Sequence, residues 1–382
     1  MRAPRHLLLV LLILFCLPGC TTSPAGLSVE AQRSWLESRL APILDDAESA
    51  GFTGAVRIVY PDGARFDSFH GVSHRQTQRA IGRDTVFHLG SVSKHWTAAA
   101  VLRAVERGDL ELHQSLDKIF PDIPDSHGVI TIHQLLTHQS GLADFPVPCS
   151  RVEAGDLTRT DFLNAVWASP VVASPGVSFH YSNAGYEVLA AVLEVLYEQE
   201  YEAILSEWFF SSLNLRNTGI DPSRWDNTER IAMGYRADGT EWGTLHSLFW
   251  GTQGPLWCNR GSGALLTDLD DLQQWLSALF AGEVLADDSL TRMLSPHVSE
   301  NRSGESGAYY GYGWSLYQGH GFLEVAHTGS LTHVLEADVR VFPELGVLVM
   351  VLGNSEAFGA TRVYPRIESV LHRWLRVQPT RQ

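Results

Sequence analysis

The sequence predicts an α+β protein in which one antiparallel sheet is built from both ends of the chain around an inserted, mainly helical block. Two strand patterns joined by a short turn lie near the N-terminus, and at least four more follow residue 300. Between them, residues from about 110 to 300 show helical periodicity and long loops. Short hairpin links make neighbouring strands antiparallel, which argues against a doubly wound parallel sheet.

The first elements are a helix and a hairpin. Residues 35–50 have an apolar stripe of helical period that ends at Gly51. Residues 54–60 and 65–71 are strand patterns on either side of the turn sequence Pro61-Asp62-Gly63-Ala64. A hairpin is therefore expected directly after the first helix.

A second helix is predicted within residues 87–107, because Gly90 supplies a turn and no further glycine or proline occurs before Gly108. Ser91 then lies at the first turn, with Lys94 on the same helix face. Apolar neighbours indicate an enclosed helix, which would remove water from the lysine and lower its pKa. A neutral Lys94 amine beside the Ser91 hydroxyl would be a general base beside a nucleophile. The N-terminus of the same helix would favour negative charge that develops on a bound acyl group.

The middle of the chain is predicted to be helical. Thr131 to Gln134 fits a capping box that opens a short helix. Further helices are expected near residues 161–167, 184–196, 203–213, 268–280 and 288–294, and residues 214–258 are expected to be loop.

Strand patterns return near the C-terminus. They cover residues 310–317, 322–326, 335–342 and 347–352. Residues 335–342 alternate and predict a half-buried strand, whereas the continuous apolar run 347–352 predicts a fully buried one. A last helix has one apolar side made of Ile367, Val370, Leu371 and Trp374.

Composition limits the function. The 382 residues are 45% hydrophobic and 19% charged, which is ordinary for a globular protein with a large core. The net charge of −15, without a run of lysine or arginine, argues against a nucleic-acid partner. Neither Cys-x-x-Cys nor His-Glu-x-x-His occurs, so no metal or other cofactor is expected.

The N-terminus predicts export. Arg2 and Arg5 precede an apolar run at residues 7–17, which is too short to span a bilayer but typical of a secretory signal. The run ends in Leu17-Pro18-Gly19-Cys20, which resembles the lipobox of bacterial lipoproteins. Residues 1–19 are thus predicted to be a signal peptide, Cys20 a lipid anchor, residues 20–30 a tether and residues 31–376 the folded domain. A plain signal peptide or an uncleaved anchor is the alternative.

These features predict a membrane-anchored lipoprotein of the bacterial cell envelope that faces the periplasm or the cell exterior. In an oxidising compartment, Cys149 and Cys258 would form a disulfide or remain as two buried thiols. Sequence alone leaves both possibilities open.

Three ordered motifs point to one family. They are Ser91-x-x-Lys94, Tyr181-Ser182-Asn183 and His327-Thr328-Gly329. In this order and with these gaps, the chain resembles the penicillin-recognising serine hydrolases, most of all the class C β-lactamase branch with its D-alanyl-D-alanine carboxypeptidase, D-aminopeptidase and esterase relatives. The resemblance covers roughly residues 27–375 and implies a β-lactamase/transpeptidase-like fold. Absence of Gly-x-Ser-x-Gly argues against an α/β-hydrolase.

The resemblance also implies a covalent mechanism. Ser91 would attack a carbonyl and form an acyl-enzyme that water releases, while Lys94 and Tyr181 accept and relay the proton. The motifs do not settle which of the two is the base. A tyrosine of pKa near ~10 needs a nearby cation such as Lys94 to act as a base at neutral pH. A tyrosine that caps a helix is the structural alternative for Tyr181.

Substrate contacts follow from the same resemblance. The backbone N–H groups of Ser91 and Ser330 would form the oxyanion hole, and Asn183 would bind the substrate amide. The strand edge at Thr328 and Gly329 would pair with a peptide-like substrate. The simplest structural roles are an N-cap for Asn183 and a tight turn or close backbone approach for residues 261–263.

His327 departs from the family pattern, in which many members have lysine. A histidine of pKa near ~6.5 is mostly neutral at pH 7, so it attracts a substrate carboxylate less than lysine does. This favours an ester, an amide or an amine-bearing peptide over β-lactams and carboxypeptidase substrates. The alternative is a structural histidine at a strand end.

Together, these observations predict an exported serine acyl hydrolase that acts on a small peptide, amide or ester without a cofactor. A β-lactamase or D-alanyl-D-alanine carboxypeptidase is one alternative. A catalytically silent lipoprotein that binds cell-wall peptides is another.

Overall fold

The computed structural model describes residues 23–144, 157–221, 225, 228–245, 247, 257–301, 307–319 and 321–380. Its main sheet has eight strands in the order β2-β1-β14-β13-β12-β11-β10-β9. The first strand, β1 (Gly54–Val59), pairs antiparallel with both β2 (Arg65–His70) and the last strand, β14 (Val347–Gly353). This confirms the predicted α+β class, with one sheet made from both ends of the chain.

The other strands and the helices fill in the middle of the chain. The remaining strands of the main sheet are β9 (Val298–Ser299), β10 (Ala308–Tyr310), β11 (Ser315–Gln318), β12 (Leu323–Leu331) and β13 (Leu335–Phe342). Three short pairs are β3 (Val72–His74) with β4 (Arg79–Ala80), β5 (Phe87–His88) with β8 (Leu266–Thr267), and β6 (Gly234–Tyr235) with β7 (Glu241–Gly243). The α-helices are α1 (Val29–Ser49), α2 (Lys94–Arg107), α3 (Asp125–Gly128), α4 (Ile132–Leu136), α5 (Arg159–Ala168), α6 (Asn183–Tyr197), α7 (Tyr201–Leu205), α9 (Leu269–Phe280), α10 (Asp287–Met293) and α11 (Tyr364–Leu375).

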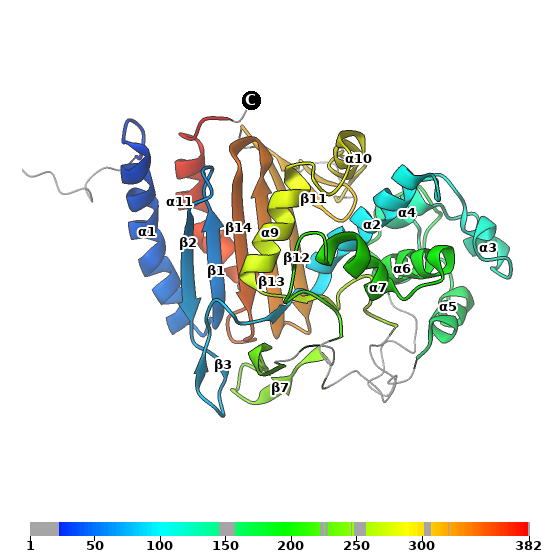
Figure 1. Cartoon of the computed structure of the whole chain (residues 1–382), viewed down its shortest axis with the longest axis horizontal. Helices are drawn as coiled ribbons and strands as arrows, with labels where there is room; N and C mark the ends of the chain where they lie inside the picture. The colour runs from blue at the N-terminus through cyan, green and yellow to red at the C-terminus, as the bar shows by residue number, and fades with distance from the viewer. Residues whose placement is uncertain are drawn as a thin grey trace, which may run out of the picture.

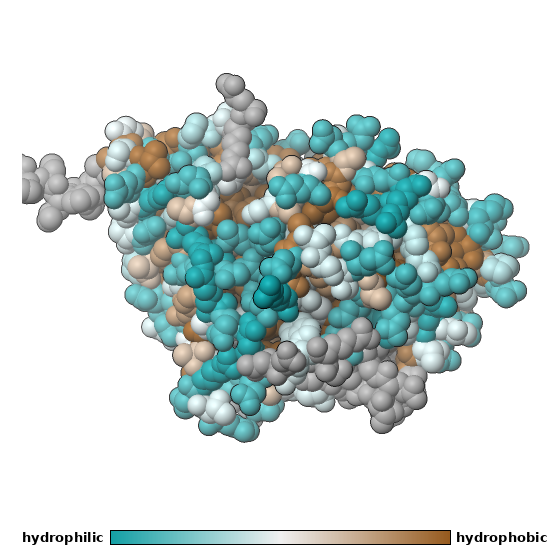
Figure 2. Space-filling model, viewed as in Figure 1, coloured by the Kyte–Doolittle hydropathy of each residue, from teal (hydrophilic) through white to brown (hydrophobic). Residues whose placement is uncertain are grey.

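The sheet separates two hydrophobic layers. The terminal helices α1 and α11 lie side by side on one face, and α2, α9 and the helical part cover the other (Figure 1). Successive side chains of β1 point to opposite faces of the sheet, so that Val56 packs toward the terminal helices and Ala55 toward α2. Hydrophilic side chains cover most of the surface seen from this side (Figure 2).

Strand β13 differs from its prediction. Its alternation predicted a half-buried strand, but Glu336 and Asp338 are only 5% and 1% exposed. Both acids have partners: Arg340 pairs with Asp338 at 2.6 Å, and Thr361 donates its hydroxyl to Glu336 at 2.7 Å. The prediction was wrong because paired polar side chains can be buried.

Most other elements lie within a few residues of their predicted positions, with three differences. Residues 214–258 were expected to be loop, but β6 and β7 form a short antiparallel pair within them. The single strand expected at 310–317 is two antiparallel strands, because Gly313, with φ of +74°, turns the chain between Tyr310 and Ser315. The helix expected at 203–213 is α7 followed by a π-helical turn, Ser206–Phe210. The capping box of Thr131 and Gln134 is confirmed.

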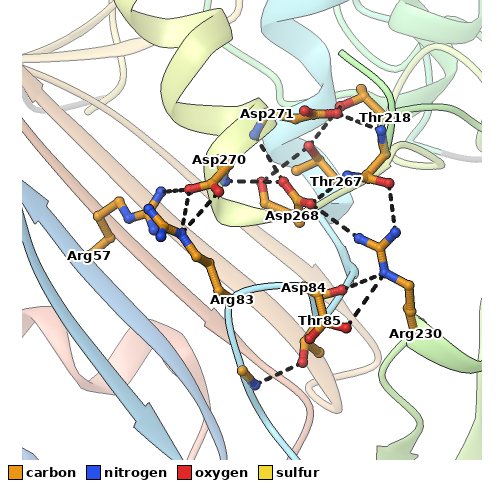
Figure 3. A network of polar contacts seen from close by, with 12 residues as sticks. Arg57, Arg83, Asp84, Thr85, Thr218, Arg230, Thr267, Asp268, Asp270 and Asp271 are labelled. Atoms are coloured by element: carbon orange, nitrogen blue, oxygen red, sulfur yellow. Dashed lines mark hydrogen bonds and ion pairs between the residues drawn. The ribbon is translucent and has the colours of Figure 1, made fainter.

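A polar network ties helix α9 to the sheet and to the segment that precedes Ser91 (Figure 3). Asp268 caps α9 by accepting from the backbone N–H of Asp271. Asp270 binds the fully buried guanidinium of Arg57 on β1 at 2.6 Å. Arg230 donates to the backbone oxygen of Asp84 and pairs with Asp268. The chain leading into β5 is therefore held against the start of α9.

Several N-terminal predictions fall outside the described residues, namely the signal peptide at 1–19 and the anchor Cys20. Helix α1 begins at Val29, so the last two residues of the predicted tether are helical. Cys258 is disulfide-bonded. Cys149 also falls outside the described ranges. None of the helices within those ranges has the length and apolar character needed to cross a membrane.

Candidate active site

Ser91 lies in a 3-10 turn, Gly90–Ser93, that continues into α2. Strand β12 packs directly against this turn. A Cβ on Gly90, whose φ is +53°, would lie 2.8 Å from the backbone nitrogen of Ser330, and one on Gly329 would lie 1.9 Å from the oxygen of Leu89. Only glycine fits at either position without moving the backbone. The backbones that carry the Ser91 and Ser330 amides are thus in close contact.

Lys94 is fully buried beside Ser91. Its Nζ lies 3.1 Å from Ser91 Oγ, 2.6 Å from Asn183 Oδ1 and 3.0 Å from the backbone oxygen of Ser262. Burial lowers the pKa of Lys94 to about 7, and the charges of Glu187 and Asp144 oppose this shift. A neutral amine has two N–H bonds, which suit Asn183 and Ser262, and its lone pair is then free to accept the proton of Ser91.

Tyr181 completes a group of three reactive side chains. Its ring centroid is 4.8 Å from Lys94 Nζ, and its side chain lines the same pocket as Ser91. Desolvation raises the pKa of Tyr181, so the phenol is protonated at neutral pH. Of the two candidate bases, Lys94 is therefore the one that is available without its proton.

Asn183 links the amine to a carboxylate. Its Oδ1 accepts from Lys94, and its Nδ2 donates to Asp144 Oδ1 at 2.9 Å. Asp144 also accepts from the backbone N–H of Asn183 at 2.8 Å. The helix N-cap is the preceding residue, Ser182, and not Asn183. One Nδ2 hydrogen remains for the predicted bond to a substrate, because an amide nitrogen carries two.

The glycine-flanked turn at 261–263 lies directly beneath Lys94. Glu187, which is fully buried, accepts from the backbone N–H groups of Gly261 at 2.8 Å and Ser262 at 3.0 Å. A Cβ on Gly261 would be 2.3 Å from the oxygen of Tyr186. The close backbone approach expected here is confirmed. Sequence reasoning missed Glu187, although an acid within the apolar run of the predicted helix 184–196 was a usable signal.

His327 ends a buried chain of hydrogen bonds. Ser182 N–H donates to His138 Nδ1 at 3.1 Å, so the ring proton of His138 is on Nε2. Nε2 of His138 lies 3.2 Å from the hydroxyl of Tyr310 and donates to it. Tyr310 then donates to His327 Nε2 at 3.1 Å, and His327 Nδ1 donates to the backbone oxygen of Thr328 at 2.7 Å. Burial, together with the charge of Lys94, lowers the pKa of His327 to about 3. His327 is therefore neutral. His138 and Tyr310 were not among the site residues predicted from the sequence.

A pocket of about 310 Å³ opens over Ser91. It is lined by Ser91, Phe179, Tyr181, Glu300, Tyr310, Ser315, His327, Thr328 and Ser330. Pairing of β12 with β11 covers only Leu323 to Ala326, so the edge from His327 onward faces no described strand on that side. Of the predicted substrate-binding residues, Thr328 and Ser330 line the pocket, whereas Asn183 and Gly329 are not among its lining residues. Cys20 is outside the described residues.

Known proteins resemble this chain over most of its length. The model of the Beta-lactamase family matches residues 36–371. Penicillin-binding protein 4 of Amycolatopsis lactamdurans is 27% identical over 324 residues, which are 79% of this chain and 80% of that protein. Esterase EstB of Burkholderia gladioli is 29% identical over 235 residues, which are 57% of this chain and 58% of that protein.

Solved structures show the same fold. The D-amino acid amidase of Ochrobactrum anthropi SV3 complexed with D-phenylalanine has a TM-score of 0.75 at 21% identity, with 88% of this chain and 98% of that chain covered. EstCE1, described as a hydrolase with promiscuous acyltransferase activity, has a TM-score of 0.74 at 23% identity, with 90% and 100% covered.

Proposed function

The chain belongs to the Beta-lactamase family and is a serine hydrolase of that family, and on this basis we propose that it hydrolyses a small ester, amide or peptide through an acyl-enzyme on Ser91. The observation that carries the proposal is the 3.1 Å contact between Ser91 Oγ and the buried Lys94 Nζ. A buried amine with a pKa of about 7 can take a proton at neutral pH.

In the proposed acylation, the neutral amine of Lys94 accepts the hydroxyl proton as Ser91 Oγ attacks the substrate carbonyl carbon. Negative charge then develops on the carbonyl oxygen. The backbone N–H groups of Ser91 and Ser330 would donate to it, an assignment supported by the close contact of their backbones through Gly90 and Gly329.

Tyr181 would carry the proton onward. Because its phenol stays protonated, it would donate its own proton to the leaving group while it accepts one from Lys94. Breakdown of the tetrahedral intermediate leaves an ester on Ser91. Water, activated by the same pair, would then attack that ester and release the acid.

The pocket supports a neutral or amine-bearing substrate over one with a carboxylate. His327 is neutral and both of its nitrogens are engaged, and Lys94 is not part of the pocket wall. A penicillin or a D-alanyl-D-alanine peptide would thus bring its carboxylate to a wall without a cation among the described residues. Relatives named as an esterase and a D-amino acid amidase are consistent with this preference.

A fluorophosphonate probe, which phosphonylates activated serines, tests the proposal. We expect stoichiometric labelling of the wild type, loss of labelling in Ser91→Ala, and full labelling of the control Ser126→Ala, which changes an exposed serine. Labelling that survives in Ser91→Ala would refute the assignment. No labelling of the folded wild type would favour a silent peptide-binding protein, and faster turnover of a chromogenic cephalosporin than of a p-nitrophenyl ester would favour a β-lactamase.

We also propose that the protein is exported and held at a membrane of the cell envelope by lipid on Cys20. The N-terminal charge pattern and the lipobox-like sequence support this location. Cys20→Ser is expected to move the protein to the soluble fraction after export. Membrane association that persists in this variant would argue against the lipid anchor.

A further inference from the structure

Glu300 is an acid on the wall of the Ser91 pocket that the proposed mechanism does not use. Among the nine lining residues it is the one that carries a charge at neutral pH, because His327 is neutral and the other seven have uncharged side chains. Glu300 directly follows β9 at the edge of the main sheet and is half-buried. The pocket therefore presents a single negative group to whatever binds there.

The carboxylate of Glu300 is incompletely satisfied. Its Oε1 accepts from the hydroxyl of Ser315 at 2.5 Å, which fixes its orientation. Its Oε2 receives no hydrogen bond from any residue within the described ranges. Burial raises the pKa of Glu300, which is the expected result for a desolvated acid without a cationic partner. A positive charge placed beside Oε2 would relieve this cost.

The rest of the pocket suits a cation as well. The aromatic residues Phe179, Tyr181 and Tyr310 line it together with Glu300, and aromatic faces attract ammonium groups. A water occupies about 30 Å³ in the liquid, so the volume of about 310 Å³ holds roughly ten waters, which is ample for an aminoacyl group. A substrate carboxylate would meet Glu300 as a like charge and be disfavoured.

We propose that Glu300 binds a positively charged amine on the acyl part of the substrate, so that the preferred substrates are esters or amides of amino acids. This rests on the proposed function, because the amine would be bound next to the carbonyl that Ser91 attacks. Glu300 would act through Oε2, with Ser315 holding Oε1, and would set specificity without taking part in proton transfer.

The test compares two esters that differ only in the ammonium group: the benzyl ester of alanine, as both enantiomers, and the benzyl ester of propionic acid. Benzyl alcohol release is measured at pH 7, below the pKa of about 8 of an α-amino group. A charge-assisted hydrogen bond is expected to make kcat/KM for the better alanine enantiomer about 10- to 100-fold higher than for the propionate. In Glu300→Gln, this ratio is expected to fall at least tenfold.

Two variants serve as controls. Glu344→Gln removes an acid from an exposed turn outside the pocket and should keep the wild-type ratio. Glu300→Asp keeps the negative charge and should retain most of the preference, which separates loss of charge from loss of the Ser315 contact. Melting curves establish that each variant is folded.

A wild-type ratio near one, or a ratio that Glu300→Gln leaves unchanged, would overturn the inference. A different result would refute the proposed function: the Ser91→Ala variant would still hydrolyse the propionate ester. Hydrolysis of that ester that depends on Ser91, without any preference for the amine, would overturn only the role of Glu300.

Discussion

Replacing Asp144 by asparagine should shift the pH dependence of activity without removing any catalytic side chain. Asp144 lies behind Asn183, and its negative charge favours the protonated form of Lys94. The variant keeps an oxygen that can accept from Asn183 but loses the charge. The pKa of Lys94 should therefore fall, and more of the amine should be neutral at a given pH.

The size of the shift follows from the geometry. Hydrogen bonds of 2.6 Å and 2.9 Å join the ammonium to the carboxylate through the Asn183 amide, which places the two charges on the order of 7 Å apart. Coulomb's law then gives about 0.6 kcal/mol at a dielectric constant of about 80 and about 2.4 kcal/mol at about 20. At ~1.36 kcal/mol for each pKa unit, the expected change is about one unit.

The assay is kcat/KM for a neutral ester between about pH 5 and pH 9, which reports the free enzyme. Only the neutral amine accepts a proton, so wild-type activity should fall with decreasing pH below about 7, the pKa of Lys94. In Asp144→Asn, this acid limb should move about one unit lower. Asp125→Asn, which removes an exposed acid from α3, should leave it in place.

An acid limb that does not move in Asp144→Asn, or that moves to higher pH, would refute the reasoning. It would mean that Lys94 is not the group whose deprotonation limits the reaction. A limb that shifts equally in the Asp125 control would indicate a general effect of net charge.

Two further predictions concern the backbone and the core. Gly329→Ala should lower kcat by at least about 100-fold. The added Cβ would lie 1.9 Å from the backbone oxygen of Leu89 and would force apart the Ser91 and Ser330 amides. A loss below about fivefold in the folded variant would contradict this. Arg340→Met should lower the free energy of unfolding by about 3–5 kcal/mol in urea titration, because it leaves the buried carboxylate of Asp338 without its cationic partner, while Glu324 keeps His372 at 3.6 Å. A change below about 1 kcal/mol would show that Asp338 is satisfied in another way.

The helices and strands of this molecule were predicted well from the sequence, because local signals such as capping residues and hydrophobic periodicity determine them. Thr131 and Gln134 form the expected capping box, and the alternation of residues 335–342 gives β13 with the predicted bounds. The order of the three motifs predicted that Ser91, Lys94, Tyr181 and Asn183 would meet, and the structure brings these side chains together.

The parts that sequence did not predict depend on contacts between distant segments. His138 and Tyr310 are 172 residues apart and meet only after the sheet and the helical part pack. Glu187 lies in an apolar helical run, and its role depends on a turn 74 residues later. Buried polar groups are placed by such tertiary partners, whereas periodicity in the sequence reports only which face of an element is apolar.

The most direct test of the account is the mass of the enzyme after rapid acid quenching during turnover of a benzyl ester, followed by peptide mapping. We expect one added acyl group, located on the peptide that contains Ser91, and no adduct in Ser91→Ala. The account would be contradicted if the acyl group of the active enzyme mapped to another residue. It would also be contradicted if the Ser91→Ala variant accumulated the same adduct.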